Sequence, residues 1–200
     1  MSEGQKVEGR QEIREAPGKV YLDVGPDIFP SFALYKIPLR KNDVYVSLHK
    51  NSKEADRSKD YIDLMDTEKQ AKKFLVTKET IGEVLGEGTV DQVILSDVLD
   101  SDPHDDPLLD RPPGYQAEVF KSFWELINLC HKYLKINGSM RIYQTRTVVL
   151  PEVYEELINS LKNNSRFAFS EDAEERKRII EIPGVVMALT IKVYKLTKIK

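Results

Sequence analysis

Short runs of apolar residues recur along the chain, and most carry apolar side chains at successive rather than alternate positions. Runs of this kind, bounded by Gly, Pro or charged residues, predict strands that are buried on both faces of a sheet. The predicted strands lie at 19–24, 43–48, 60–64, 90–96, 139–145, 166–169 and 185–196.

Helical periodicity separates several of these runs. Val119, Phe123, Ile127 and Cys130 recur with the spacing of one helical face and predict a long amphipathic helix over 115–134 that stops at Asn137-Gly138. Further helices are predicted at 31–37, 67–75, 77–85 and 151–161, and the polar stretch 51–59 indicates a loop or a stub of helix. The Asp- and Pro-rich segment 100–114 predicts a long loop, and loops of that length are often functional.

Strands that alternate with helices predict an α/β fold with a mainly parallel sheet, covered on both sides. The last two predicted strands are separated only by a charged stretch at 170–178, with no full crossover helix. Two parallel strands need such a crossover, so this pair is expected to be antiparallel. We expect one α/β domain over 18–200, preceded by a flexible tail at 1–17.

The composition narrows the classes of function. The 200 residues carry 30 Lys and Arg against 33 Asp and Glu, a net charge of −3, so the overall charge does not indicate nucleic acid or an anionic membrane as partner. No apolar run approaches the roughly 20 residues of a membrane helix, so no membrane partner is expected. The single cysteine, Cys130, excludes an internal disulfide framework and a Cys-rich zinc site, which suits a cytoplasmic protein.

Four stretches of the chain, at 20–26, 61–66, 90–99 and 126–145, resemble class I S-adenosylmethionine-dependent methyltransferases when taken in order. They are similar to that family's first strand with its glycine turn, its acidic segment beside the adenine, its fourth strand, and its long helix with the fifth strand. The resemblance implies a Rossmann-like three-layer sandwich with a seven-stranded sheet and an antiparallel closing strand. It also implies S-adenosylmethionine as cofactor and a methyl acceptor that the sequence does not identify.

In open α/β sheets, ligands bind beyond the carboxyl ends of the strands, where the strand order reverses. Glycine lets a backbone approach a ligand closely, and carboxylates favour a cationic sulfonium with an α-amino group. Asp23 and Asp97 are the candidates for that cationic end, and Asp63 or Asp66 for the adenine amino group. The full set of predicted cofactor-binding residues is Asp23, Gly25, Asp27, Ser47, Leu48, Asp63, Asp66, Ser96 and Asp97.

The chain departs from the family pattern at two points. Asp27 stands where the first turn would carry a second glycine. The second predicted strand continues into His49 and Lys50, without the acid that would hold both ribose hydroxyls, and Ser47 or His49 offers only one hydrogen bond. These departures favour an alternative, a non-catalytic interaction or regulatory module with a degenerate cofactor pocket. A third hypothesis, a nucleotide-dependent oxidoreductase, needs more glycines than Gly25 alone.

Methyl transfer does not require a catalytic base, because the protein accelerates it mainly by aligning the nucleophile with the activated methyl group. The candidate catalytic residues are therefore only Asp97 and His104, and a solvated loop histidine is the favoured interpretation of His104. The carboxylates around His104 are more typical of a soluble loop than of a metal site, so no metal is predicted. Cys130 is expected to be a buried, unreactive thiol.

Overall fold

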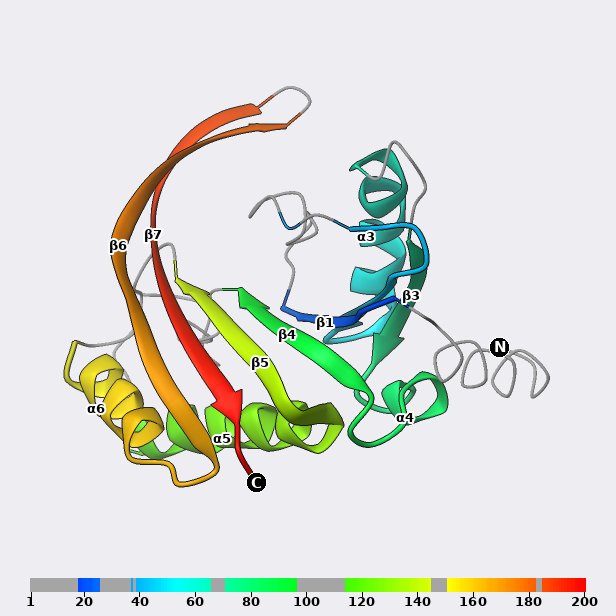
Figure 1. Ribbon diagram of the computed structural model, residues 1–200. Coiled ribbons are helices and arrows are strands. Elements are labelled where there is room, and N and C mark those ends of the chain that lie inside the picture. The colour runs from blue at the N-terminus through cyan, green and yellow to red at the C-terminus, as the bar shows by residue number, and fades with distance from the viewer. Residues whose placement is uncertain are drawn as a thin grey trace.

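The computed structural model in Figure 1 describes residues 18–25, 37, 39–65, 71–96, 114–144, 151–182 and 185–200. Its strands are β1 (Val20–Val24), β2 (Val44–His49), β3 (Lys72–Thr77), β4 (Val90–Ser96), β5 (Leu134–Gln144), β6 (Phe167–Ile182) and β7 (Val185–Lys198). Its helices are α3 (Ser52–Met65), α4 (Ile81–Val84), α5 (Tyr115–Tyr133) and α6 (Pro151–Lys162).

All these strands form a 7-stranded sheet in the order β3-β2-β1-β4-β5-β7-β6. The first five strands pair in parallel, whereas β7 is antiparallel to both β5 and β6. The chain runs outward from β1 to β3 and then returns to place β4 on the other side of β1, so the order reverses between β1 and β4. The predicted parallel sheet with an antiparallel closing strand is confirmed.

Helices cover the sheet on both faces, which gives three layers (Figure 1). The larger core lies on the face of α5 and α6, where Val119, Phe123 and Ile127 pack against strand residues such as Leu22 and Leu95. On the opposite face a smaller cluster gathers beneath α3; its buried members are Tyr21, Tyr45, Ile62, Ile94, Tyr143 and Val193.

The helix predicted over 115–134 is present as α5, and its buried positions follow the predicted face. It ends at Tyr133, and Leu134 enters β5 directly, so Asn137-Gly138 is not the helix stop but an irregularity within β5. Asn137 has a φ of 64°, and a Cβ at Gly138 would lie 2.9 Å from the carbonyl oxygen of Lys135. A side chain larger than hydrogen therefore does not fit at position 138.

Two neighbouring assignments between β2 and β4 were wrong. The segment 60–64, predicted as the third strand, belongs to α3, and the segment predicted as a helix over 67–75 contains the start of β3. The helix begins at an N-cap that the sequence analysis overlooked: the Glu54 amide donates to Asn51 Oδ1 at 3.0 Å, and Glu54 Oε2 accepts the amide of Lys50, the residue before the cap, at 3.2 Å. A helix started there continues through 60–64 and buries Ile62 against the sheet.

Smaller differences concern element lengths. The helix predicted at 77–85 is reduced to α4, because Thr80 and Thr77 first form a turn, with the Thr80 amide donating to the Thr77 carbonyl at 3.1 Å. The charged stretch 170–178 lies within β6 rather than between two strands. The helix predicted at 31–37 lies outside the described residues, apart from residue 37.

Two carboxylates fix the amino end of β1 between its neighbours. The Lys19 amide donates to Asp43 Oδ1 at 2.8 Å, and the Val20 amide donates to Asp91 Oδ2 at 2.8 Å. Asp43 precedes β2 and also accepts the Arg40 amide at 2.8 Å, while Asp91 lies in β4. Side chains from both flanking strands thus satisfy backbone donors where the central strand begins.

We expect Asp43→Ala and Asp91→Ala each to lower the free energy of unfolding by about 1–3 kcal/mol, because each leaves partly buried amides without their acceptor. Urea denaturation followed by circular dichroism measures this. Lys135→Ala is the control: it removes only the half-exposed ammonium that bonds Asp91, and it should cost no more than about 1 kcal/mol. Unchanged unfolding midpoints in both aspartate variants would contradict the clamping role.

Candidate functional site

The candidate site lies at the carboxyl ends of β1, β2 and β4, on the edge where the strand order reverses. β1 is buried along its whole length and ends at Val24. Gly25 follows with a φ of 70°, a left-handed conformation that glycine adopts without steric cost. The chain therefore turns sharply at the point where the fold places its ligands.

Asp23 is fully buried in the central strand, one residue before the end of β1. The Tyr45 hydroxyl donates a hydrogen bond to its carboxylate. In the strand register Asp23 lies opposite Ser47 and Tyr21 opposite Tyr45, so the bond runs diagonally from β2 to β1 on one face of the sheet. A buried carboxyl group is costly unless it is hydrogen-bonded, and the Tyr45 hydroxyl supplies such a bond.

Ser47 and His49 follow Tyr45 at alternate positions of β2 and so share its face. Ser47 Oγ and His49 Nε2 lie 2.9 Å apart, and both side chains are buried. Burial lowers the pKa of His49 below its usual value, with the Glu54 carboxylate acting in the opposite direction, so the ring is neutral at pH 7. The end of β2 thus carries a neutral imidazole held by a hydroxyl, where the family resemblance leads one to expect an acid.

The other predicted residues fall into three groups. Ser96 ends β4 beside β1, opposite Tyr143 of β5, and is almost fully buried. Leu48 also lies near this edge, but its side chain packs in the larger core on the other face of the sheet. Asp63 lies in α3 and not on a strand, which corrects its placement. The remaining candidates, Asp27, Asp66, Asp97 and His104, lie outside the described residues.

One acidic residue at this edge was missed. Glu79 lies two residues beyond the end of β3, and the Thr77 hydroxyl donates to Glu79 Oε2 at 2.6 Å. This hydrogen bond lowers the pKa of Glu79, which keeps an exposed, ionised acceptor at the carboxyl end of β3. An acidic residue directly after the third strand would have identified this position. Glu79 was not found because the sequence analysis placed the third strand at 60–64.

These groups can bind a ligand, but they contain no activated nucleophile. Asp23 and Glu79 are acceptors, Ser47 can donate or accept, and neutral His49 offers one ring nitrogen to each role. Cys130 is buried on α5, and burial raises its pKa to about 12, which confirms the predicted unreactive thiol. Within the described ranges, no three His, Cys, Asp or Glu side chains gather as metal ligands would.

Comparison with known proteins gives matches in structure but not in sequence. No family model matches the chain, and no curated protein matches it. A S-adenosylmethionine-dependent O-methyltransferase from Thermotoga maritima superimposes with a TM-score of 0.55 at 13% identity, covering 98% of this chain and 65% of that one. This chain thus spans just under two thirds of the Thermotoga protein.

Two further solved structures are similar. A putative O-methyltransferase from Klebsiella pneumoniae matches with a TM-score of 0.53 at 11% identity, over 99% of this chain and 81% of that one. A precorrin-6y C5,15-methyltransferase from Geobacter metallireducens gives 0.53 at 11% identity, over 96% and 88%. Identities this low establish the architecture alone: the chain has the class I, Rossmann-like fold of S-adenosylmethionine-dependent methyltransferases.

Proposed function

We propose that the chain binds S-adenosylmethionine at the carboxyl ends of β1, β2 and β4 and transfers its methyl group to an acceptor. The observation that carries the proposal is Asp23, a fully buried carboxylate held by Tyr45, one residue before the left-handed turn at Gly25. A carboxylate kept in the central strand at the switch point suits a cationic ligand. The similar solved structures named above are described as methyltransferases, the Klebsiella protein as a putative one, which supports the same class of reaction.

Each described group has an assigned part of the ligand. Asp23 serves the cationic methionine end, together with Asp97 as predicted from the sequence. His49 and Ser47 stand in for the acid that would hold the ribose hydroxyls, with the neutral ring accepting or donating one bond. Glu79 takes the adenine amino group in place of Asp63 or Asp66, because it follows the actual third strand.

S-adenosylmethionine supplies a methyl group activated by its sulfonium. The protein's part is to hold donor and acceptor in line and to exclude water, so a general base is not required. Asp97 and His104 remain the predicted candidates should the acceptor need to lose a proton. The acceptor itself is not assigned, and the cytoplasmic location predicted from cysteine usage stays part of the proposal. None of the described helices is long and apolar enough to cross a membrane.

One observation favours a second candidate function, a non-catalytic module with the same fold. The end of β2 bears His49, bonded to Ser47, in the place of an acid that would accept two hydrogen bonds. Loss of one such contact lowers affinity by about 10- to 100-fold. A chain that binds the cofactor too weakly to use it would keep the scaffold for another purpose, and direct binding measurements separate the two functions.

Isothermal titration with S-adenosylhomocysteine should give saturable 1:1 binding. Asp23→Asn should weaken that binding about tenfold or more, because it removes the charge that faces the ligand's amino group. Asp56→Asn, at an exposed position of α3, is the matched control and should bind like the parent. Absence of heat from the parent chain at high protein concentration would favour the non-catalytic module.

Glu79→Gln tests the corrected adenine contact. The amide keeps the size of the side chain but removes its charge and one acceptor oxygen, so we expect a loss of about three- to tenfold in S-adenosylhomocysteine affinity. Because Glu79 is exposed, circular dichroism and the unfolding midpoint should stay unchanged. Equal affinity in parent and variant would remove Glu79 from the site.

The neutral state of His49 predicts how stability depends on pH. Its pKa is lowered in the folded chain, so the unfolded chain binds more protons below pH about 6.5, and stability falls as the pH falls through that value. Thermal unfolding at pH 7.5 and 5.0 should show a smaller difference for His49→Asn than for the parent. Burial also lowers the pKa of His131, but that ring is only partly buried, so His131→Asn should reduce the difference less than His49→Asn does. An unaltered pH response in His49→Asn would count against a neutral imidazole.

A further inference from the structure

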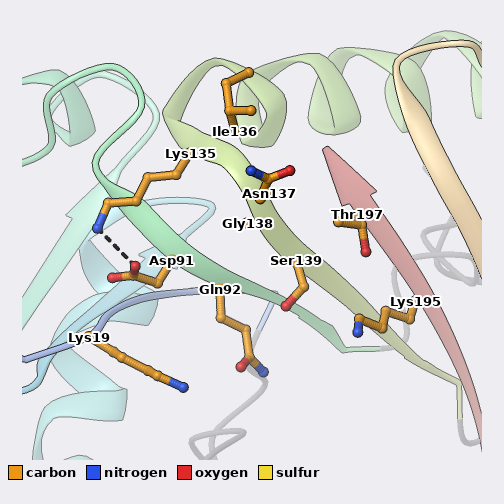
Figure 2. A pocket seen from close by; sticks show the side chains of 10 residues that line it. All are labelled: Lys19, Asp91, Gln92, Lys135, Ile136, Asn137, Gly138, Ser139, Lys195 and Thr197. Atoms are coloured by element: carbon orange, nitrogen blue, oxygen red, sulfur yellow. Dashed lines mark hydrogen bonds and ion pairs between the residues drawn. The ribbon is translucent and has the colours of Figure 1, made fainter. Parts of the chain in front are cut away.

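A polar hollow of about 330 Å³ lies at the opposite edge of the sheet, where the parallel strands begin (Figure 2). Lys19 precedes β1, Gln92 lies at the start of β4, Ser139 in β5, and Lys195 and Thr197 near the end of antiparallel β7. A strand of seven residues, such as β4, spans about 20 Å. None of the described cofactor-binding candidates lines the hollow, and Lys195, which lies in the cross-strand row of Ile94 and Asp23, is three strands, about 14 Å, away from Asp23.

The charge of the hollow is positive, although the whole chain carries −3. Its lining contains three lysines and one acid, Asp91. Asp91 is already engaged, because one carboxylate oxygen accepts the Val20 amide and the other binds Lys135 Nζ at 2.8 Å (Figure 2). In the part of the chain that the structure describes, neither Lys19 nor Lys195 forms an ion pair. Both lysine side chains are exposed.

Neutral hydrogen-bonding groups lie in register beside the two lysines. Gln92 pairs with Ser139 and Ser139 with Thr197, so the three side chains form a row across β4, β5 and β7. The next row on the same face contains Arg141 opposite Lys195. Over the described residues the side chains of Gln92, Ser139 and Thr197 have no hydrogen-bond partner. Thr197 follows Lys195 by two residues, and Gln92 pairs with Tyr21, two residues after Lys19, so amide and hydroxyl groups lie about 7 Å along the strand direction from each lysine backbone.

We infer that this hollow binds a phosphate group, independently of the proposed function at the other edge. Phosphate accepts several hydrogen bonds and carries the opposite charge, and lysine serves it as a point charge beside neutral donors. The phosphate belongs either to a free nucleotide or to the backbone of a nucleic acid, and both present the same group to the same side chains. The competing interpretation is a solvated sheet face with no ligand.

Isothermal titration of the full chain with inorganic phosphate, against chloride at matched ionic strength, tests the site. Lys195→Ala and Lys19→Ala should each weaken phosphate binding about two- to fivefold, and the double variant about tenfold. Lys195→Arg should retain binding. Lys121→Ala, exposed on α5 beyond the other face of the sheet, is the control and should behave like the parent. Equal phosphate affinity in the double variant and the parent, or equal binding of chloride, would overturn the inference.

Two further probes identify the source of the phosphate. Tighter binding of ADP than of a ten-residue oligouridylate would indicate a nucleotide. Tighter binding of the oligonucleotide, with an affinity that falls steeply with salt, would indicate a nucleic-acid backbone. Either ligand should lose affinity in the Lys19 and Lys195 double variant, whereas S-adenosylhomocysteine binding should not change. If the double variant bound both ligands as tightly as the parent, the site would again be rejected.

Discussion

The structure depends on how β1 is held between β2 and β4. β1 is short and buried on both faces, so each of its polar groups needs a partner within the sheet. At its amino end, Asp43 and Asp91 from the two flanking strands accept the amides of Lys19 and Val20. At its carboxyl end, the Tyr45 hydroxyl bonds Asp23. These contacts set the register of the central strands, and thereby the position of the turn at Gly25.

On the face of the sheet that α3 covers, the strand residues differ in how deeply they are buried. Beneath α3, alternate residues of β1 and β2 such as Tyr21 and Tyr45 pack into a cluster that is aromatic and partly polar. Farther along, β5 alternates Met140 and Ile142, which are buried in the larger core, with the only partly buried Ser139 and Arg141. That alternation is typical of a strand with one packed face and one polar face. On this face, Tyr143 of β5 and Val193 of β7 still belong to the buried cluster, whereas Ser139, Arg141 and Lys195 are partly or fully exposed.

Much of the fold follows from local patterns. The apolar run of β4, the periodic face of α5 and the missing crossover before β7 each predict their element, because these features depend only on neighbours in the sequence. The region between β2 and β4 was mispredicted for two reasons. The N-cap at Asn51 was overlooked, and β3 is only partly buried and lacks the continuous apolar run of a central strand.

The site was predicted less completely than the fold. The positions of Asp23, Gly25 and Ser47 near the carboxyl edge follow once the strands are known. Strand alternation alone places Leu48 on the face opposite Ser47. The bond from Tyr45 to Asp23 depends on the register between two strands, and the neutral charge of His49 depends on burial by distant parts of the chain. Neither the strand register nor the burial of His49 can be read from the sequence pattern. The electrostatics of the site therefore follow only from the structure.

Charge is divided between the two edges of the sheet. Asp23 and Glu79 lie near the carboxyl ends of β1 and β3, whereas Lys19 and Lys195 line the polar hollow and form no ion pair with any described residue. In the strand register Lys195 lies opposite Arg141, and Arg141 and Asp23 both flank Ile94, so Lys195 and Asp23 are three strand spacings, about 14 Å, apart across the sheet. That distance exceeds the Debye length of about 8 Å at physiological salt, so salt weakens the interaction between the two groups. The two proposals therefore concern different side chains and ligands of opposite charge, so a substitution at Lys19 or Lys195 leaves the side chains proposed to hold the cofactor unchanged.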